Sequence, residues 1–552
     1  MRNNADSSYP SFPMPPALNL RLLKQTASLV LALFVLNFAL TFHNVWPTLA
    51  ITTRFELSVE IAILVLVLAV FFHFRRRIRP ALLLSLAAVL TLMTLARYVE
   101  VTAPALFGRR VNLYWDARYL PHVTEMLTES THPLLLVLFI AGALLLLGLI
   151  FTALYFSLRR LTRGFARPLE FRLLCSLMAA LTFAYFMGHL NQPVHTLKYY
   201  SLPLSLTYWQ QVQFINSVMA NEASDVIPDQ SSLKDYDLSA LQGSDVIVQF
   251  IESYGATAFD NPTLAYSIGP ALENFTNSIR ETERRVVSAF VEAPTFGGNS
   301  WLSHSSFMTG LDINHLSTYN LLMTQNRTTL SDKFSTRGFR PVALMPGLRA
   351  DWPEGAFYGF ESIYGAEEIN YQGPEFGWWR IPDQFSLQKM HELEFAVQPR
   401  DPLFMLFTSI TPHMPFRPTP PYQPDWDRLL SDKPYDEEAV QNALDLLPEW
   451  TNLQPAYAGT LNYTFAYLSG YLSRHADDDF VWVILGDHQP PASVSGQDVR
   501  WDVPVHIVSD RNEIIESLLD SGFVEGLQPE PAPLSKIYLL PDILLSAFSS
   551  RP

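Results

Sequence analysis

Long apolar runs separated by short polar segments occupy most of the first 190 residues of the chain. The runs lie at roughly 24–42, 58–74, 80–96, 134–157 and 171–189. Each is close to the ~20 residues that an α-helix needs to cross the hydrocarbon core of a bilayer. The pattern predicts a five-span transmembrane domain over residues 24–190, preceded by a short cytoplasmic N-terminus over residues 1–23.

Basic residues between the runs predict the orientation of these spans. They cluster before the first run, in the tract 75–79 between the second and third, and over 159–172 between the fourth and fifth. Lys and Arg concentrate in cytoplasmic loops. With five spans, all three clusters fall on one side, which is then cytoplasmic, and the chain after residue 190 falls on the other side.

The pattern changes after a juxtamembrane connector over residues 191–240. Short β-branched or apolar runs, typical of buried strands, alternate with stretches of helical spacing from residue 241 to residue 552. This alternation predicts an α/β outer domain with a largely parallel sheet sandwiched by helices. The expected strands lie at 245–251, 285–291, 341–345, 402–409, 480–485 and 503–508, and the expected helices at 270–284, 302–308, 460–474 and 534–548.

Composition narrows the possible partners. Apolar residues make up 49% of the chain and charged residues only 16%, which agrees with a membrane protein. The formal net charge of −15 makes a nucleic-acid partner unfavourable. The single cysteine, Cys175, lies in an apolar run, so neither a disulfide within the chain nor a cysteine-based zinc site is available.

Four polar signals follow expected strands in the outer domain. Glu252 and the pair Asp487-His488 each follow a strand directly, and His413 comes shortly after another. Ser300 follows a Gly-Gly-Asn loop and precedes a helical stretch, whose free N–H groups favour a phosphate. Each signal alone is explained by a surface acid, a turn, a loop histidine or a helix cap. Because the carboxyl ends of parallel strands share one edge, together they predict a metal-assisted site.

The residues after Ser300 carry a family resemblance. Phe307-Met308 and Thr309-Gly310 match the end of the sulfatase signature, whereas its Pro and Arg are absent, with Leu302 and His304 at their places. The chain resembles the sulfatase-like branch of the alkaline phosphatase superfamily. Within that branch it is similar to membrane-bound lipoteichoic acid synthases and to related phosphoglycerol and phosphoethanolamine transferases.

The resemblance implies roles for particular residues. It implies one divalent cation held by Glu252, Ser300, Asp487 and His488, and an oxygen-rich site with one histidine suits Mn²⁺ or Zn²⁺ better than Mg²⁺. Ser300 is then an unmodified nucleophile and His413 a second catalytic residue. The substrate-binding residues that we expect from this resemblance are His304, Trp301, Trp379, Arg380 and Asp383.

The implied function is a metal-dependent transferase of the bacterial inner (plasma) membrane, with its catalytic domain on the extracytoplasmic side. It would move phosphoglycerol or phosphoethanolamine from a membrane phospholipid to a glycan, polymer or lipid acceptor through a covalent Ser300 intermediate. A sulfatase or phosphodiesterase, in which water is the acceptor, uses the same residues. A catalytically inactive membrane regulator is the third alternative, since the Pro and Arg of the signature are missing.

Overall fold

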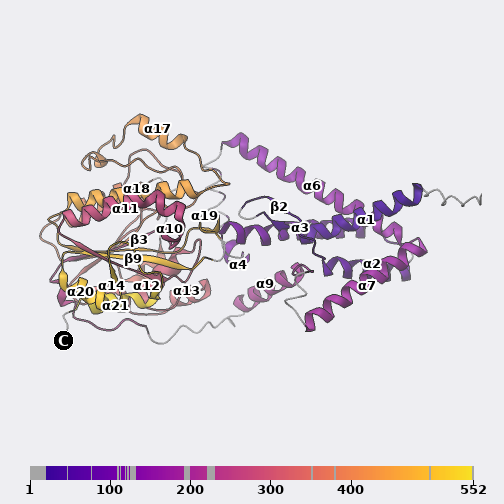
Figure 1. Cartoon of the computed structure of the whole chain (residues 1–552), viewed down its shortest axis with the longest axis horizontal. Helices are drawn as coiled ribbons and strands as arrows, with labels where there is room; N and C mark the ends of the chain where they lie inside the picture. Colours follow the sequence, from indigo (N-terminus) through magenta and orange to yellow (C-terminus); the bar gives the residue numbers. More distant parts are fainter. Residues whose placement is uncertain are drawn as a thin grey trace, which may run out of the picture. The chain divides into compact units, whose positions relative to one another are not determined.

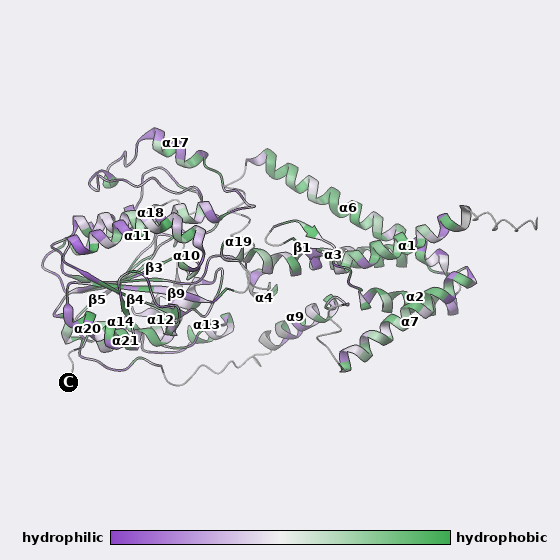
Figure 2. Cartoon of the chain, viewed as in Figure 1, coloured by the Kyte–Doolittle hydropathy of each residue, from purple (hydrophilic) through white to green (hydrophobic). Residues whose placement is uncertain are grey.

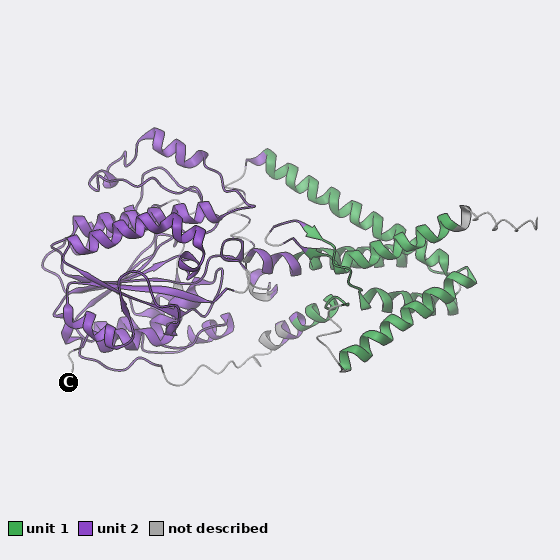
Figure 3. Ribbon diagram, viewed as in Figure 1, with its two compact units in different colours: residues 1–43, 51–99, 134–210 green, residues 44–50, 100–133, 211–552 purple. Residues whose placement is uncertain are grey.

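The chain folds into two compact units, shown in different colours in Figure 3. Unit 1 comprises residues 1–43, 51–99 and 134–210, and unit 2 comprises residues 44–50, 100–133 and 211–552. The computed structural model describes residues 20–549, except for a set of short segments. These are residues 46–47, 76, 108–110, 112, 118–119, 121–123, 125–127, 129–131, 192–198, 220–230, 350–351, 378–380 and 497–498.

Helices account for most of the first 219 residues, and Figure 2 shows how hydrophobic they are, α6 in particular. Three of them begin at a proline, which is favourable at a first helical position because its missing N–H needs no partner there. The elements are α1 (Leu20–Thr41), β1 (His43–Asn44), β2 (Ile51–Thr52), α2 (Val59–Arg75), α3 (Pro80–Phe107), α4 (Leu113–Asp116), α6 (Pro133–Gly164), α7 (Pro168–Asn191) and α9 (Leu204–Met219).

Four helices in the described part of the chain are long and apolar enough to cross a membrane: Leu23–Thr41, Pro80–Leu106, Pro133–Gly164 and Pro168–Leu190. The remaining predicted span forms α2, which has 17 residues. At 1.5 Å per residue α2 is about 25 Å long, shorter than a ~30 Å hydrocarbon core. Four candidate membrane helices are therefore present among the described residues, while the count of five spans and the orientation that depends on it stay predictions.

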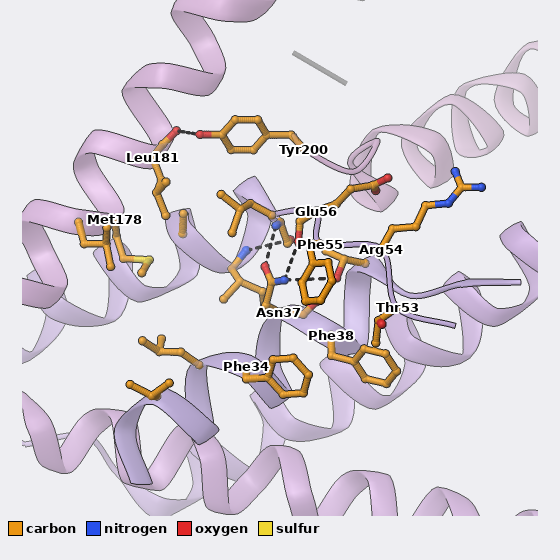
Figure 4. A pocket seen from close by; sticks show the side chains of 18 residues that line it. Phe34, Asn37, Phe38, Thr53, Arg54, Phe55, Glu56, Met178, Leu181 and Tyr200 are labelled. Carbon is orange, nitrogen blue, oxygen red and sulfur yellow. Dashed lines mark hydrogen bonds between the residues drawn. The ribbon is translucent and has the colours of Figure 1, made fainter. Parts of the chain in front are cut away.

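Unit 1 contains a cavity of about 380 Å³ with mostly apolar walls (Figure 4). One of its polar groups is the Asn37 amide, which donates to the carbonyl of Glu56 at 2.8 Å and accepts from the N–H of Ser58 at 2.8 Å. Nearby, the Tyr200 hydroxyl donates to the carbonyl of Leu181 at 2.9 Å. These bonds satisfy polar groups among apolar side chains, and the two made by Asn37 fix the segment before α2 against α1.

A nine-stranded sheet forms the centre of unit 2, in the order β10-β4-β9-β8-β3-β7-β5-β6, with β11 also paired to β4. The strands are β3 (Asp245–Ile251), β4 (Arg285–Glu292), β5 (Arg340–Leu344), β6 (Ser362–Tyr364), β7 (Leu403–Thr408), β8 (Phe480–Gly486), β9 (Asp502–Ser509), β10 (Val524–Glu525) and β11 (Pro533–Lys536).

The predicted largely parallel sheet is confirmed, with two strands, β9 and the two-residue β10, running the other way. The five strands β8, β3, β7, β5 and β6 are parallel to one another. Strand β9 is antiparallel to both β8 and β4, so β4 again points in the same direction as β8. The carboxyl ends of β3, β4, β7 and β8 therefore lie at one edge of the sheet.

Helices cover both faces of this sheet, as Figure 1 shows: α11 and α18 on one face, and α12, α14, α20 and α21 on the other. A hydrophobic core lies on each face of the sheet, and alternate residues of β3 pack into one or the other. Ile247 and Ile251 belong to the core on the α11 and α18 side, and Val246 and Val248 belong to the core on the opposite side. The helices are α10 (Thr257–Asp260), α11 (Pro262–Glu281), α12 (Ser300–Thr309), α13 (Leu316–Leu322), α14 (Leu330–Ser335), α15 (Ala366–Ile369), α16 (Asp383–Met390), α17 (Glu437–Asp445), α18 (Gln454–Arg474), α19 (Ala492–Ser495), α20 (Asn512–Asp520) and α21 (Leu540–Ala547), with the shorter turns η2 (Ser239–Leu241), η3 (Pro353–Tyr358), η4 (His391–Phe395), η5 (Arg428–Leu430) and η6 (Ile537–Leu539).

Three predicted helices have clearly different bounds in the structure, one of them α18, which begins at Gln454 rather than at residue 460. Helix α11 begins at Pro262 rather than at Pro270, because Asn261 caps it by accepting from the N–H groups of Thr263 and Leu264. The predicted helix 534–548 is divided. Its first residues form β11, which pairs with β4, and the helix proper, α21, begins at Leu540.

Candidate active site

Two carboxylates meet at the carboxyl edge of the sheet because of the register between β3 and β8. Ile251 of β3 is paired with Gly486 of β8, and the next residue on each strand is an acid, Glu252 and Asp487. Asp487 is almost completely buried, and the side chain of Glu252 is 11% exposed. The strand pairing alone thus places both acids side by side, as the sequence predicts.

Ser300 reaches the same edge from the end of β4 through a glycine-rich loop. Gly297, Gly298 and Asn299 all have positive φ, of 65°, 142° and 63°. Such a succession needs glycine or asparagine, since other side chains are strained there. Ser300 is the first residue of the ten-residue helix α12, so its hydroxyl lies where the helix presents free N–H groups.

The Ser300 hydroxyl lies between an acid and an imidazole. Its Oγ donates to Glu252 Oε2 at 2.9 Å and lies 3.1 Å from His488 Nε2. The other ring nitrogen, His488 Nδ1, is 2.8 Å from the carbonyl of Gln489, which can only accept. Nδ1 therefore carries the proton, and the lone pair of Nε2 faces the site.

One carboxylate oxygen in this cluster has no hydrogen-bond partner. Asp487 Oδ1 accepts from the backbone N–H of Ser253 at 2.8 Å and of His488 at 2.7 Å. Asp487 Oδ2 is buried and, within the described residues, receives no hydrogen bond, although His488 Nε2 is 3.8 Å away. A buried anionic oxygen without a donor is costly, and a cation at this point would satisfy it.

The donor set fits a divalent cation. Glu252, Asp487 and His488 each offer one ligand atom, all within 4.8 Å of one another. The Ser300 oxygen adds a fourth donor beside them. Three oxygens and one nitrogen suit Mn²⁺ or Zn²⁺.

The two acids perturb each other strongly. Burial opposes ionisation of Glu252, but interactions with His488 and His413, together with side-chain hydrogen bonds that include the one from Ser253, outweigh it and lower the pKa of Glu252 to about 2. Burial and the adjacent Glu252 raise the pKa of Asp487 well above its usual value. Two buried carboxylates in contact do not both ionise readily without a positive charge, so this pair has the electrostatics of a metal site.

His304 lies one turn along α12 from Ser300. Its ring is tilted against that of Phe250, with centroids 4.5 Å apart, and its Nε2 is 4.0 Å from Asp487 Oδ2. Burial lowers the pKa of His304 to about 4, so the ring is neutral at physiological pH. It therefore provides a neutral hydrogen-bonding group beside Asp487 rather than a fixed positive charge.

A cavity of about 300 Å³ opens beside Ser300. Trp301 and His304, both predicted to bind substrate, line it. Three aromatic residues that the sequence did not reveal as site residues also line it, namely Tyr319, Trp352 and Tyr358. Trp352 and Tyr358 stack with centroids 5.4 Å apart, and a run of aromatic residues from 352 to 360 was the signal that could have indicated them. The site therefore has an apolar, aromatic side next to its nucleophile.

The other predicted residues come from the loop after β7 and from α16. His413 follows β7, and its electrostatic interaction with Glu252 is among the causes that lower the pKa of Glu252. Asp383 opens α16 and is fully buried; its two oxygens accept from the N–H groups of Ile410 and Thr411 at 2.9 and 2.8 Å. Asp383 thus fixes the loop that carries His413. Trp379 and Arg380 lie outside the described residues.

Ser253 is a further residue of the site that sequence reasoning missed. Its Oγ donates to Glu252 Oε1 at 2.9 Å, and its N–H donates to Asp487. It has a positive φ of 58°, and its carbonyl accepts from the Tyr457 hydroxyl at 2.8 Å. Ser253 therefore orients both acids at once. It does so from a left-handed backbone conformation that a serine in the sequence does not predict.

No family model and no curated protein matches the chain. Among solved structures, it is similar to a protein of the alkaline phosphatase superfamily from Vibrio parahaemolyticus, at 16% identity and a TM-score of 0.34, over 58% of this chain and 68% of that one. It is similar to the lipoteichoic acid synthase LtaP from Listeria monocytogenes, at 14% identity and a TM-score of 0.35, over 58% and 79%. It is also similar to the integral membrane lipooligosaccharide phosphoethanolamine transferase A (EptA) from Neisseria meningitidis, at 12% identity and a TM-score of 0.43, over 77% and 76%.

The names of these structures belong to the group that the sequence motifs resemble. Identities of 12–16% and TM-scores below 0.5 carry no information on the reaction of this chain. Its chemistry therefore rests on its own residues.

Proposed function

We propose that this chain is a membrane-anchored, metal-dependent transferase that uses Ser300 as a covalent nucleophile. It moves phosphoglycerol or phosphoethanolamine from a membrane phospholipid to a glycan, polymer or lipid acceptor in the cell envelope. The observation that carries this proposal is the position of Ser300 Oγ, 2.9 Å from Glu252 Oε2 and 3.1 Å from His488 Nε2, next to the unpartnered Asp487 Oδ2.

Glu252, Asp487 and His488 would hold the cation together with the Ser300 oxygen, with Mn²⁺ or Zn²⁺ favoured by the donor set. When bound, a divalent cation lowers the pKa of a coordinated hydroxyl and offsets negative charge on phosphoryl oxygens. A serine hydroxyl without such help is a weak nucleophile at neutral pH. The pairing of a raised Asp487 pKa with a lowered Glu252 pKa supports this assignment.

The proposed first step replaces one ester bond with another. Ser300 Oγ, having released its proton to water, forms a bond with the phosphorus of the lipid head group. The bond between phosphorus and the diacylglycerol oxygen breaks, and His413 gives that oxygen a proton. In the second step an acceptor hydroxyl loses its proton to His413 and bonds to phosphorus, and the bond to Ser300 Oγ breaks. Free N–H groups at the start of α12 favour the phosphoryl charge throughout.

The aromatic cavity beside Ser300 would receive the transferred group. Trp301, Trp352 and Tyr358 offer apolar ring faces there, which can pack against glycerol carbons or attract an ethanolamine ammonium. The membrane helices would bring the site close to its lipid donor. A donor confined to the bilayer is encountered more often by a catalyst anchored in the same bilayer.

Trapping the intermediate tests this function. The full chain in lipid vesicles is incubated with phosphatidylglycerol or with phosphatidylethanolamine, quenched in acid and digested, and the peptide containing Ser300 is examined by mass spectrometry. We expect an added mass equal to phosphoglycerol or phosphoethanolamine, which identifies the donor. Ser300→Ala removes the adduct, and Ser300→Thr keeps a hydroxyl and serves as the matched control that retains it.

Two results would change the assignment. If no adduct forms with either lipid, in the presence of Mn²⁺ or Zn²⁺, the covalent mechanism is wrong. If the adduct forms but free phosphoglycerol or phosphoethanolamine accumulates at the same rate with and without an added hydroxyl acceptor, the chain is a hydrolase. A product joined to the acceptor, dependent on Ser300, supports the transferase.

A further inference from the structure

A second group of metal-ligand side chains lies at the opposite edge of the same sheet, where β3 and β8 begin. It consists of His391, His475 and Asp478. His391 opens η4, His475 follows the last residue of α18, and Asp478 lies in the turn before β8. Because β8 has seven residues at about 3.3 Å each, this group is separated from Asp487 by about 20 Å along the strand.

The spacing of the three side chains matches a coordination shell. Asp478 Oδ2 lies 3.0 Å from His475 Nδ1 and 4.0 Å from His391 Nδ1. Two ligands on one tetrahedral zinc ion, at bonds of about 2.1 Å, are separated by about 3.4 Å. The observed distances bracket that value, so small side-chain rotations would bring all three atoms onto one ion.

The two imidazoles face each other in an arrangement that a single hydrogen bond does not explain. Their rings stack with centroids 3.8 Å apart, and both are largely buried, with side-chain exposures of 16% for His391 and 9% for His475. Nε2 of His475 is buried and, among the described residues, has no hydrogen-bond partner. Asp478, at 47% exposure, leaves the group open to solvent on one side, which gives an ion a way in.

Two of the three arginines around the group are in ion pairs, and the third, Arg284, is buried with two guanidinium nitrogens that lack a hydrogen-bond partner among the described residues. Arg400 is paired with Asp245, and Arg474 is paired with Asp427. Arg284 donates to the backbone carbonyl of Asp478, in the same turn. Burial lowers the pKa of both imidazoles, to about 3 for His475, so their nitrogens are neutral and available as ligands at neutral pH.

We propose that His391, His475 and Asp478 form a second divalent-cation site, of the zinc class, distinct from the Ser300 site. Two imidazoles and one carboxylate with an open position are a donor set that zinc favours. The ion would fasten η4 and the end of α18 to the start of β8. Through α16, whose first residue Asp383 holds the loop of His413, it would also fix the far end of a helix that supports the active edge.

One group competes with the ion. The Tyr471 hydroxyl lies 3.2 Å from His391 Nδ1 and can donate to it. Tyr471→Phe removes this donor while keeping the ring that packs against Trp482, with centroids 5.3 Å apart. A metal site predicts equal or tighter zinc binding in this variant, whereas a purely hydrogen-bonded cluster predicts only a loss of stability.

Counting bound zinc tests the proposal. The full chain in detergent is stripped with a chelator, reloaded with a small excess of Zn²⁺ over two equivalents and passed through a desalting column before elemental analysis. We expect two ions in the wild type, one in Asp487→Ala and none in Asp487→Ala combined with Asp478→Asn or with His475→Gln. An Asp487→Ala chain that retains no zinc, or combined variants that still retain one ion, would overturn the second site.

Cobalt gives an independent readout. In the Asp487→Ala background, Co²⁺ at the second site should produce visible absorption bands of a histidine-ligated ion, and Asp478→Asn should abolish them. Asp478 is half exposed, so this variant is expected to stay folded, which circular dichroism verifies. Adduct formation on Ser300 is measured separately in His475→Gln, where we expect it to persist; failure of the transferase proposal would leave the zinc count unchanged.

Discussion

The two edges of the sheet in unit 2 carry similar residue types in different states. At the carboxyl edge, Asp487 is buried with one oxygen unpartnered and lies near the Ser300 hydroxyl. At the amino edge, Asp478 is half exposed and already contacts His475 at 3.0 Å. In the first arrangement an unpartnered carboxylate oxygen lies beside a serine hydroxyl, whereas in the second the hydroxyl at 3.2 Å from His391 Nδ1 is the phenol of Tyr471. The same side chains can therefore serve chemistry at one edge and stability at the other.

Replacing the central residue of each edge should produce the largest contrast. Ser300→Ala is expected to lower transfer at least ~10³-fold because no other group can form the covalent intermediate. His475→Gln at the other edge should leave the initial rate within about 3-fold, since only distant support is lost. Rates of release of labelled head group from vesicles measure both. Equal losses would show that the amino edge takes part in the chemistry.

Replacing one aspartate at each edge gives a second matched pair of variants, with a smaller expected effect on activity. Asp487→Asn removes a charge from the proposed ligand set and should reduce activity about 10²- to 10³-fold, with loss of the ion at that edge. Asp478→Asn should change activity less than about 3-fold while lowering the melting temperature in zinc. Activity assays and thermal unfolding of both variants, with and without Zn²⁺, are the measurements. The division of roles is wrong if Asp478→Asn is the more damaging to catalysis.

The core between the two edges contains a buried histidine, His506, that should make the folded state less stable in acid. His506 of β9 is fully buried; its ring contacts the hydroxyls of Tyr254 at 3.0 Å and Ser288 at 2.7 Å, and burial lowers its pKa to about 3. Between about pH 6.5 and 3, His506 therefore binds a proton in the unfolded chain but not in the folded chain. The stability that His506 confers is fully present above about pH 6.5 and is lost as the pH falls, by up to ~1.4 kcal/mol per pH unit.

Denaturant unfolding of the chelated chain at a series of pH values measures this slope. His506→Gln should be less stable at neutral pH, because its hydrogen bonds are altered, but its stability should depend less steeply on pH. An unchanged slope would mean that His506 is not responsible for the acid sensitivity of the core.

The aromatic side of the active edge should show the smallest effect. Trp352→Ala removes one wall of the cavity beside Ser300 and is expected to raise the KM for the lipid donor about 5-fold, with kcat changed less, because packing against the head group is lost before the chemical step. Tyr266, which is 87% exposed on α11, offers a control for loss of an aromatic ring away from the cavity. A fall in kcat without a change in KM would place Trp352 in the chemical step instead.

Much of the active edge could be predicted because it depends on local order in the sequence. Strand β3 was expected at residues 245–251 and is observed there, so Glu252 had to stand at its carboxyl end. The Gly-Gly-Asn loop likewise marks the start of α12 at Ser300. The antiparallel direction of β9 and the division of residues 534–548 between β11 and α21 were not predictable, since both depend on pairing with distant β4.

The sequence by itself determined the apolar helices, the alternation of strands and helices, and the acids, serine and histidines that end those strands, because periodicity and turn chemistry act between near neighbours. Only the tertiary structure decided that Asp487 Oδ2 lacks a partner, that Ser253 orients both acids, and that Trp352 and Tyr319 line the cavity. It alone also brought His391 to His475 and Asp478, across more than 80 residues of chain. Such contacts are made by strand register and helix packing, which no local pattern of residues encodes.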